Sequence, residues 1–354
     1  MSNFRQDSIN FLNGNHVNMG PHQYEDHAGM RDGVSMSGFR LWLEADQKRA
    51  AASEAAGENM ASVERATARM VARDIEAEEL LPEALHAIEL GPGTVSAFDD
   101  QTLPIIRAFH KVSSIVCKIV DKSQKFINDI RAEQKFSDIQ IDWVNGDFFG
   151  DRVRYFDEDK DALLIMFGTI SNLHAPVSNE PPIQELADTL TNLADKIRRG
   201  WLLFSFDADQ DGEKIKTYYR EHPDFQINIF YRMQVEGLAE GWLDNRFDPK
   251  AFDYEPEWHA GSGQLAHMAV LNRDMTFTMD GQEITLKKGQ KLHMKNSFKL
   301  TPELFEAACE IAHLDVTRAW LDTSVKFYLM KKLMPATDPL PQPKLGSNRQ
   351  LIAA

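Results

Sequence analysis

The stretch that decides the fold is IELGPGTVSAFDD, residues 88–100, in which an apolar run and an acid lead into Gly91, Pro92 and Gly93. It begins like a nucleotide-binding loop. A dinucleotide fingerprint needs a third glycine near position 96, where this chain has Ser96. Two interpretations therefore stand: a loop for a cofactor that has no pyrophosphate, or only a tight turn.

Short apolar runs around this loop predict a mostly parallel sheet. Each run is typical of a strand buried on both faces. Helix-length segments lie between them, most clearly at 122–135 and 183–199. Alternating strands and helices indicate an α/β fold with right-handed crossovers. The predicted strands are 86–90, 113–120, 139–144, 162–168 and 201–207.

After residue 250 the hydrophobic period changes. A hairpin turn is predicted in MDGQE, residues 279–283, because Asp-Gly favours a two-residue β-turn. Thr301 and Pro302 predict a helix start, with a capping hydroxyl followed by proline in the first turn. The apolar face of that helix is predicted to be Leu304, Phe305, Ala308, Ile311 and Ala312. Further strands are predicted at 264–271, 275–278, 282–298, 314–321 and 325–330.

The two ends of the chain have a different texture. Residues 1–37 are polar and lack periodicity, so we expect a loop or lid there; the irregular spacing of His16, His22 and His27 does not indicate a metal site. A helical pattern follows from about residue 38 to 78. The tail from Pro335 is predicted to be disordered.

Composition limits the possible partners and the compartment. The formal charge of −15 argues against nucleic acid, because phosphate binding depends on clustered Lys and Arg. Cys117 and Cys309 lie far apart in apolar contexts, which predicts two buried thiols in a reducing compartment. With no secretory signal and no apolar run of membrane length, the sequence predicts a soluble, cytoplasmic protein without a membrane partner.

Two further markers follow strands two and three. Asp121 comes directly after the second strand, and Gly146, Asp147 and Phe148 follow the third. Ligands of a parallel sheet bind at the carboxyl ends of its strands, and glycines let them approach the backbone closely. Acids that can accept bonds from ribose and adenine, with an aromatic to cover the purine, favour S-adenosylmethionine. The alternatives are a helix cap for Asp121 and a turn residue for Asp147.

With these motifs in order, the chain resembles a known family. ELGPGT, CKIVDKS, GDFF, MFGTISNL, FQINIFYRM, DPKAF and MKNSFKLTPE, between about residues 85 and 332, resemble the histidine-specific N-alpha-methyltransferases of ergothioneine biosynthesis. The resemblance is most specific in GTISNL and NSFKLTPE. It implies a Rossmann-like, class I S-adenosylmethionine-dependent methyltransferase with a second, mixed α+β substrate domain.

The resemblance also implies a domain organisation. A mostly helical or loop segment, 1–80, would contribute to the substrate domain. The Rossmann-like domain would comprise 81–211 and 299–334, the substrate-domain insertion 212–298, and the tail 335–354.

Site residues follow from the same resemblance. It places the cofactor on Glu89, Gly91, Gly93, Asp121, Asp147 and Phe148. It implies that Asn172 holds the amino or carboxylate group of a small amino-acid substrate, and that Tyr218 or Tyr219 faces the same group. Met268 falls where the family has a pocket methionine; an ordinary core position is the alternative. No residue pattern demands a metal.

The substrate-reading positions depart from the family. Where the family has a glutamate and a serine that read an imidazole, this chain has Lys295 and Ser297, which we expect on one strand face together with His293. A lysine cannot accept a bond from a ring N–H. It suggests a substrate other than histidine, with a distal carboxylate, carbonyl or nitro group, unless the lysine turns to solvent or pairs with an acid. The family's tyrosine-rich N-terminal signature is not recognisable, and Tyr24 is its candidate replacement.

Three functions are consistent with these residues. The first is an N-methyltransferase for a small amino-acid-like amine, in natural product biosynthesis. The second is a non-catalytic protein that binds S-adenosylmethionine or its product. The third is an NAD-dependent oxidoreductase, which the missing third glycine and the long spacing from Gly91 to Asp121 disfavour.

Overall fold

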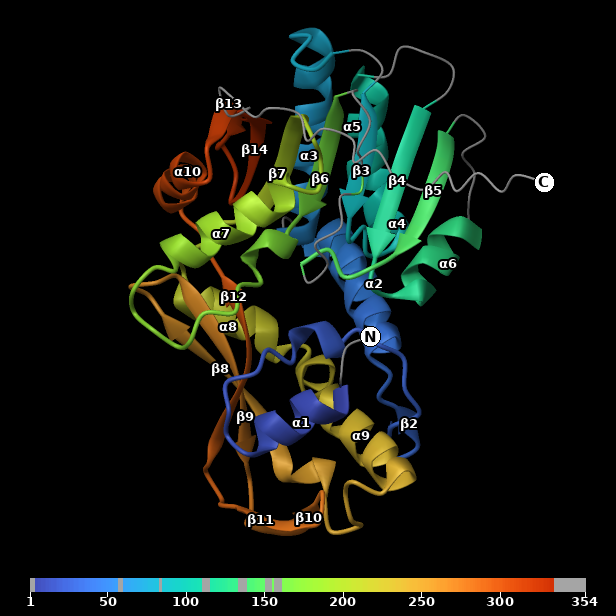
Figure 1. The fold of residues 1–354 in the computed structure, drawn as a ribbon, viewed down its shortest axis with the longest axis vertical. Coiled ribbons are helices and arrows are strands. Elements are labelled where there is room, and N and C mark those ends of the chain that lie inside the picture. The colour runs from blue at the N-terminus through green and yellow to red at the C-terminus, as the bar shows by residue number, and fades with distance from the viewer. Residues whose placement is uncertain are drawn as a thin grey trace, which may run out of the picture.

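A twisted sheet of seven strands forms the upper half of the molecule in the computed structural model (Figure 1). The structure describes residues 4–56, 60–82, 85–109, 115–132, 139–149, 155 and 161–333. The strand order is β13-β14-β7-β6-β3-β4-β5, with β3 to β7 parallel and β14 antiparallel to both of its neighbours. The strands are β3 (His86–Leu90), β4 (Ile115–Asp121), β5 (Ile139–Asn145), β6 (Ala162–Phe167), β7 (Gly200–Asp207), β13 (Leu314–Trp320) and β14 (Val325–Lys332). The predicted parallel α/β sheet is confirmed.

Burial differs between the centre and the edges of this sheet. The central strands β3, β6 and β7 are buried along almost their whole length, as their apolar runs predict. Burial on both faces was wrong for β5, which alternates between buried and exposed residues. The reason is its position at the sheet edge, where it pairs only with β4.

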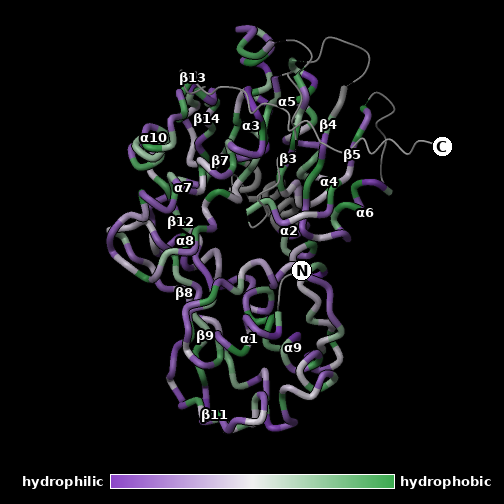
Figure 2. Tube along the Cα trace, viewed as in Figure 1, coloured by the Kyte–Doolittle hydropathy of each residue, from purple (hydrophilic) through white to green (hydrophobic). Residues whose placement is uncertain are grey.

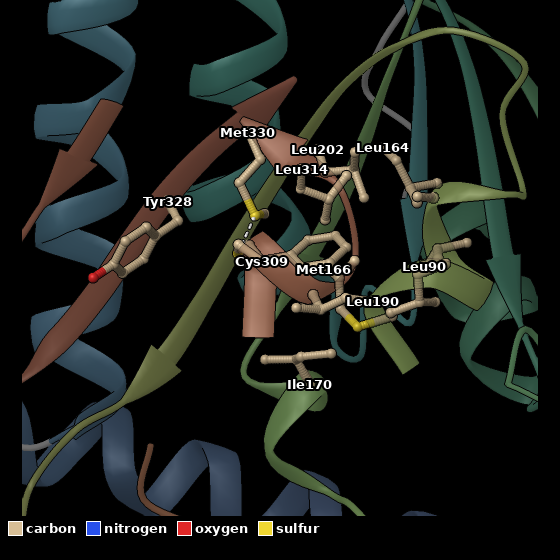
Figure 3. Close-up of a cluster of buried hydrophobic side chains, with 14 of the residues drawn as sticks. Leu90, Leu164, Met166, Ile170, Leu190, Leu202, Cys309, Leu314, Tyr328 and Met330 are labelled. Atoms are coloured by element: carbon tan, nitrogen blue, oxygen red, sulfur yellow. Dashed lines mark hydrogen bonds between the residues drawn. The ribbon is translucent and has the colours of Figure 1, made fainter. Parts of the chain in front are cut away.

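Helices cover both faces of the sheet. On one face α7 (Ile183–Ala194) and α10 (Pro302–Ile311) pack against alternate strand residues; Figure 3 shows Leu190 and Cys309 beside Leu164, Met166 and Leu202. On the other face α3 (Met60–Ala77) and α5 (Leu103–Phe109) pack against the intervening strand residues. Both cysteines are buried, as predicted.

The start of α10 confirms the expected cap. The Thr301 hydroxyl accepts a hydrogen bond from the Leu304 N–H at 3.3 Å, and Pro302 occupies the first turn. Most of the predicted apolar face of this helix packs inward. Ile311 does not: it is exposed at the carboxyl end of the helix.

The lower half contains a three-stranded antiparallel sheet, β12-β9-β8, with two helices and a hairpin beside it (Figure 1). The Asp-Gly turn is confirmed, since Asp280 and Gly281 both have positive φ between the hairpin strands. The predicted strand 282–298 is in fact two strands, because a turn with Gly289 at φ +80° separates them. The elements are α8 (Gly212–Arg220), α9 (Pro223–Glu240), β8 (Phe252–His259), β9 (Gln264–Leu271), β10 (Met275–Met279), β11 (Gln282–Leu286) and β12 (Lys291–Phe298).

The N-terminal segment is more ordered than its polarity predicts. The expectation of a loop over 1–37 was wrong in part, because α1 (Phe4–Leu12) is a helix, and β1 (Met30–Arg31) pairs with β2 (Val34–Ser35). Phe4, Ser8, Phe11 and Leu12 form one buried face of α1, which contacts α9 and β12. The chain then rises through α2 (Gly38–Ala56) and α3 to the back of the large sheet (Figure 1).

Hydropathy follows this arrangement. In Figure 2 hydrophobic segments run through the large sheet, whereas the outer loops of the lower half are mostly hydrophilic. In the part of the chain that the structure describes, every helix is too short or too polar to cross a membrane. The predicted disordered tail, 335–354, lies outside the described residues.

Short helices connect the strands of the large sheet. After β3 come α4 (Val95–Ala97), a π-helical turn (Phe98–Thr102) and α5, and after β4 comes α6 (Gln124–Ala132).

Candidate active site

The glycine turn lies at the carboxyl end of β3, as the fold requires of a ligand loop. Gly91 and Gly93 both have φ of +70°, which favours glycine at each position. A Cβ on Gly91 would lie 3.3 Å from Cζ of Phe148, whereas one on Gly93 would meet no atom within 4 Å. The Thr94 hydroxyl then caps the next turn by accepting the Ala97 N–H at 3.2 Å. The turn therefore presents its backbone to open space beside an aromatic ring.

Two buried acids lie under this turn. Glu89 is 2% exposed, and its Oε2 has no hydrogen-bond partner among the described residues. Burial raises the pKa of Glu89 to about 8. Asp121, the last residue of β4, is 8% exposed, and burial raises its pKa to about 7 although its Oδ1 accepts the Ser123 N–H at 2.7 Å. In its ionised form, each carboxyl can accept a bond from a further donor.

Asp121 is not the cap of the helix that follows. The hydroxyl of Ser123 accepts the Phe126 N–H at 3.4 Å at the start of α6, so the capping side chain is Ser123. The helix-cap alternative for Asp121 was therefore wrong. The Asp121 side chain lies at the same edge of the sheet as the glycine turn.

Asp147 and Phe148 follow β5 at the same edge. The carboxylate of Asp147 accepts the Phe149 N–H at 3.2 Å and lies 3.5 Å from the Lys122 ammonium, so it does serve the turn. The same carboxylate is also 42% exposed. Phe148 is buried against Gly91. The structure thus brings together all six residues that the sequence assigns to a cofactor.

These residues fit S-adenosylmethionine. Its ribose and amino-acid tail carry hydroxyl and ammonium donors, and the site offers a buried carboxyl oxygen without a partner and a second buried acid at the neighbouring strand end. Glu89 and Asp121 each supply a carboxyl group of the kind that such donors need. No phosphate has to be accommodated.

A small pocket lies beside the carboxyl ends of β6 and β7. Its volume is about 50 Å³. Of the predicted substrate residues, Asn172, Tyr219 and Ser297 line it. Tyr218 does not; it packs edge-on against Tyr219 with ring centroids 5.2 Å apart. The complete lining is Glu64, Gly168, Ser171, Asn172, Asp207, Tyr219, Ser297, Phe298, Lys299 and Val325.

A buried ion pair forms one wall of this pocket. The Lys299 ammonium lies 2.6 Å from the Asp207 carboxylate, and Lys299 is buried. Burial opposes the lysine charge, but Tyr219 and Asp207 more than offset that effect and raise the pKa of Lys299. The pair stays charged and neutralises itself.

Ser297 is engaged by a histidine of the chain. The imidazole Nε2 of His267 lies 3.0 Å from the Ser297 hydroxyl, and its Nδ1 lies 2.8 Å from the Tyr254 hydroxyl. His267 is fully buried, and its pKa is lowered far below the usual value, first by burial and then by Lys295 and Lys299. The neutral ring packs edge-on against Tyr219 at 4.9 Å. The imidazole of His267 therefore already bonds to the serine hydroxyl that would be expected to bond to the imidazole of a histidine substrate.

The faces of β12 differ from the sequence prediction. Lys295 pairs with His267, but His293 pairs with Met268, so a β-bulge separates them. Because paired residues project to the same face, Lys295 and Ser297 share their face with Leu292, and His293 shares the other with Asn296. The expectation that His293 lies with Lys295 and Ser297 was wrong, and Leu292 is on their face. The cause is the extra residue in the bulge, Met294.

Lys295 extends from this face toward the N-terminal segment. It is 9% exposed, so the alternative of a lysine turned to solvent was wrong. Its ammonium lies 5.2 Å from the ring centroid of Phe225. Tyr24 packs on that ring at 5.3 Å, and Trp42 packs on both at 5.4 Å. The structure brings Tyr24 and Lys295 to one aromatic cluster, beyond Ser297 along the strand.

Met268 lies apart from these residues. It is buried on the opposite face of the small sheet, paired with His293 and Glu255. Of the N-terminal histidines, His22 lies 2.9 Å from Asp7, and His16 stacks on His293. Within the described ranges no group of three or more His, Cys, Asp or Glu is arranged to hold a metal ion.

Sequence reasoning missed several pocket residues. Asp207 is the last residue of the buried strand β7, as Asp121 is of β4, so the signal used for Asp121 applies equally to it. His267 stands as a lone polar residue in an apolar strand, which marks a position without giving its role. Glu64 is one of three acids in a helix rich in Ala and Arg, and nothing in the sequence distinguishes it.

A doubly wound sheet with an antiparallel hairpin at one edge, a glycine turn and strand-end acids define a class I, S-adenosylmethionine-dependent methyltransferase. A family model described as histidine-specific, S-adenosylmethionine-dependent methyltransferase matches residues 61–332. The protein belongs to this family, and S-adenosylmethionine is its cofactor.

Individual relatives were also found. An uncharacterised protein of Sinorhizobium fredii, y4iF, is 35% identical over 282 residues, which cover 77% of this chain and 90% of that protein. Among solved structures, an S-adenosylmethionine-dependent methyltransferase from Clostridium acetobutylicum matches with a TM-score of 0.43 and 10% identity over 82% of this chain and 98% of its own. One described as a putative S-adenosylmethionine-dependent methyltransferase, from Listeria monocytogenes, matches with a TM-score of 0.36 and 8% identity over 75% of this chain and 100% of its own. The family assignment rests on the family model and the 35% identical relative.

Proposed function

We propose that the protein methylates the amine of a small amino-acid-like substrate other than histidine. The observation that carries the proposal is the meeting of Asn172, Tyr219 and Ser297 around one small pocket. These residues come from three distant parts of the chain, and all were assigned to the substrate from the sequence. The Asn172 amide and the Tyr219 hydroxyl are groups that can orient an amine lone pair.

The cofactor and the protein contribute different parts of the proposed reaction. S-adenosylmethionine supplies an activated methyl group when bound. The chain's own residues have to bind the amine, align it and exclude water. The pocket suits this role, because amide, phenol and hydroxyl groups from distant parts of the chain meet there.

Two contacts argue against histidine as the substrate. The hydroxyl of Ser297 already bonds to His267, and Lys295 carries no acceptor for an imidazole N–H. Lys295 lies next to Ser297 on the same face of β12, and its side chain ends at the aromatic cluster of Tyr24, Trp42 and Phe225. A substrate whose amine lies in the pocket and whose distal end extends along β12 would meet a buried positive charge. We therefore expect a distal carboxylate, carbonyl or nitro group.

The test is calorimetric titration with S-adenosylhomocysteine, followed by titration of the saturated protein with single amino acids and related amines. We expect micromolar binding of S-adenosylhomocysteine, and tighter binding of amines with a distal acceptor than of histidine. Mass spectrometry with S-adenosylmethionine should then find the methyl group on the amine nitrogen of the best binder. Preferred binding and methylation of histidine would refute the proposed substrate class.

A further inference from the structure

Glu64 stands out among the pocket residues because no role has been assigned to it. It projects from α3, and its carboxylate reaches the pocket that Asn172 and Tyr219 line. Its Oε1 lies 3.8 Å from the position that a Cβ on Gly168 would take. Glu64 is therefore at the turn that ends β6, next to the residues assigned to the substrate amine.

Hydrogen bonds fix the orientation of this carboxylate. The Ser205 hydroxyl donates to Oε1 at 2.5 Å, and the Gln101 amide donates to Oε2 at 3.4 Å. The Ser205 oxygen in turn accepts the Gly168 N–H at 3.1 Å. The sheet, the turn after β6 and α3 are thus joined through one side chain, which holds Glu64 at the pocket wall.

Charge gives the carboxylate a specific preference. The other ionised side chains that line the pocket are Asp207 and Lys299, and they neutralise each other at 2.6 Å. Arg65, the neighbour of Glu64 on α3, points to Asp100 at 3.7 Å. The charge of Arg65 also acts on Glu64, but the lysine that lines the pocket is paired with Asp207. A carboxylate at the wall of such a pocket favours a cation as ligand.

We propose that the Glu64 carboxylate receives the ammonium group of the substrate and removes its proton before methyl transfer. The inference rests on the proposed function, because it requires an amine substrate. In this step an N–H bond breaks, its electron pair stays on the nitrogen as the lone pair, and an O–H bond forms on Glu64. The proton passes to solvent when the product leaves, which restores the carboxylate. An amine needs this step because its ammonium form has no lone pair to react.

The basicity of Glu64 suits the step. Burial, and then the nearby charge of Asp207, raise the pKa of Glu64, although the hydrogen bonds from Ser205 and Gln101 and the charge of Arg65 oppose the change. A carboxyl with a raised pKa is a better base than an ordinary one at neutral pH.

The ammonium of S-adenosylmethionine is the rival source of the cation. Two features favour the substrate. The cofactor side has its own acid in Glu89, whose Oε2 has no partner in the described part of the chain. The pocket at Glu64 is walled by Tyr219 and Ser297, which belong to α8 and β12 rather than to the strand ends that hold the glycine turn.

The test compares Glu64→Gln with wild type and with Glu76→Gln, an exposed acid on the same helix. Glutamine keeps the size of Glu64 and an acceptor for Ser205 but removes the charge. S-adenosylhomocysteine affinity is measured first. The saturated proteins are then titrated with the best-binding amine of the panel above and with its desamino analogue. We expect S-adenosylhomocysteine affinity within twofold of wild type, at least tenfold weaker amine binding, and no loss for the desamino analogue.

Other outcomes separate the possibilities. Unchanged amine affinity in Glu64→Gln would overturn the assignment, and an equal loss of S-adenosylhomocysteine affinity would assign Glu64 to the cofactor instead. If wild type binds no amine at all, the proposed function and this inference fall together. Should Glu64→Gln not fold, Glu64→Asp keeps the charge but withdraws it by one methylene. It should weaken amine binding while sparing the desamino analogue, and equal effects on both would overturn the assignment.

Discussion

The cofactor side and the substrate side of this active site are built in opposite ways. The six residues that we predict to bind the cofactor all lie between Glu89 and Phe148, and each lies at or just after the end of a parallel strand. The proposed substrate side combines α3, the turn after β6, α8 and β12, whose residues are far apart in the chain. A local rule about strand ends is enough for the first, whereas the second depends on how distant segments pack.

The largest effect we expect is on the cofactor side. Asp121→Asn should weaken S-adenosylhomocysteine binding about 100-fold, because charge-assisted hydrogen bonds to ribose hydroxyls are each worth about 1.5–3 kcal/mol. Calorimetry measures the change. Asp129→Asn, on the neighbouring helix α6, is the control. Equal affinities of Asp121→Asn and wild type would show that the Asp121 carboxylate does not bind the cofactor, and that acids at strand ends do not define the cofactor side.

A pH dependence sharpens the same contrast. The pKa of Asp121 is raised to about 7, so the carboxyl is mostly protonated at pH 6 and ionised at pH 8. Since ribose hydroxyls bind the ionised form better, S-adenosylhomocysteine affinity should rise about tenfold across this interval. Asp121→Asn should lose that rise. Any increase that continues above pH 8 is assigned to Glu89, whose pKa is about 8.

On the substrate side, Lys295→Glu should change preference rather than cofactor affinity. Replacing a buried cation by an anion should disfavour substrates with a distal carboxylate and favour those with a distal cation, by about tenfold in relative affinity. Competition titrations of the S-adenosylhomocysteine-saturated protein measure this. Lys291→Glu, more exposed on the same strand, should leave the ranking unchanged. An unaltered ranking in Lys295→Glu would remove Lys295 from the substrate side.

The smallest effect concerns the stability of the glycine turn. Gly91→Ala and Gly93→Ala both place a side chain at φ +70°, which costs about 1–2 kcal/mol. Gly91→Ala also pushes on Phe148 at 3.3 Å, so we expect it to be less stable than Gly93→Ala by about 1 kcal/mol in urea unfolding. Equal stabilities would mean that Phe148 gives way freely and does not fix the turn.

How much the sequence could predict follows from the same division. The parallel strands were predictable because burial on both faces gives continuous apolar runs. That the proposed cofactor residues lie at one edge was predictable because the strand ends of a parallel sheet meet there. Asp207 obeys the same rule and was overlooked. The helix α1 also left a signal, since Phe4, Ser8 and Phe11 repeat at helical spacing within a polar stretch.

The rest could not be predicted, for physical reasons. Glu64 gains its role only because Ser205 and Gly168, more than 100 residues away, come to its side chain. The faces of β12 were mispredicted because a bulge depends on strand pairing and has no compositional mark in LHMKNSF. The choice between Tyr218 and Tyr219 likewise required the packing of α8.

The extra residue at Met294 exchanges the two faces of β12 for every residue that follows it. Before it, the face of Leu292 belongs to an apolar cluster; after it, the same face carries Lys295 and Ser297. One continuous strand can therefore contribute to a hydrophobic core at one end and to a polar site at the other end. It also follows that a one-residue deletion here would rotate Leu292 out of its cluster or the polar pair out of the site, so the length of this segment is under tighter constraint than its composition.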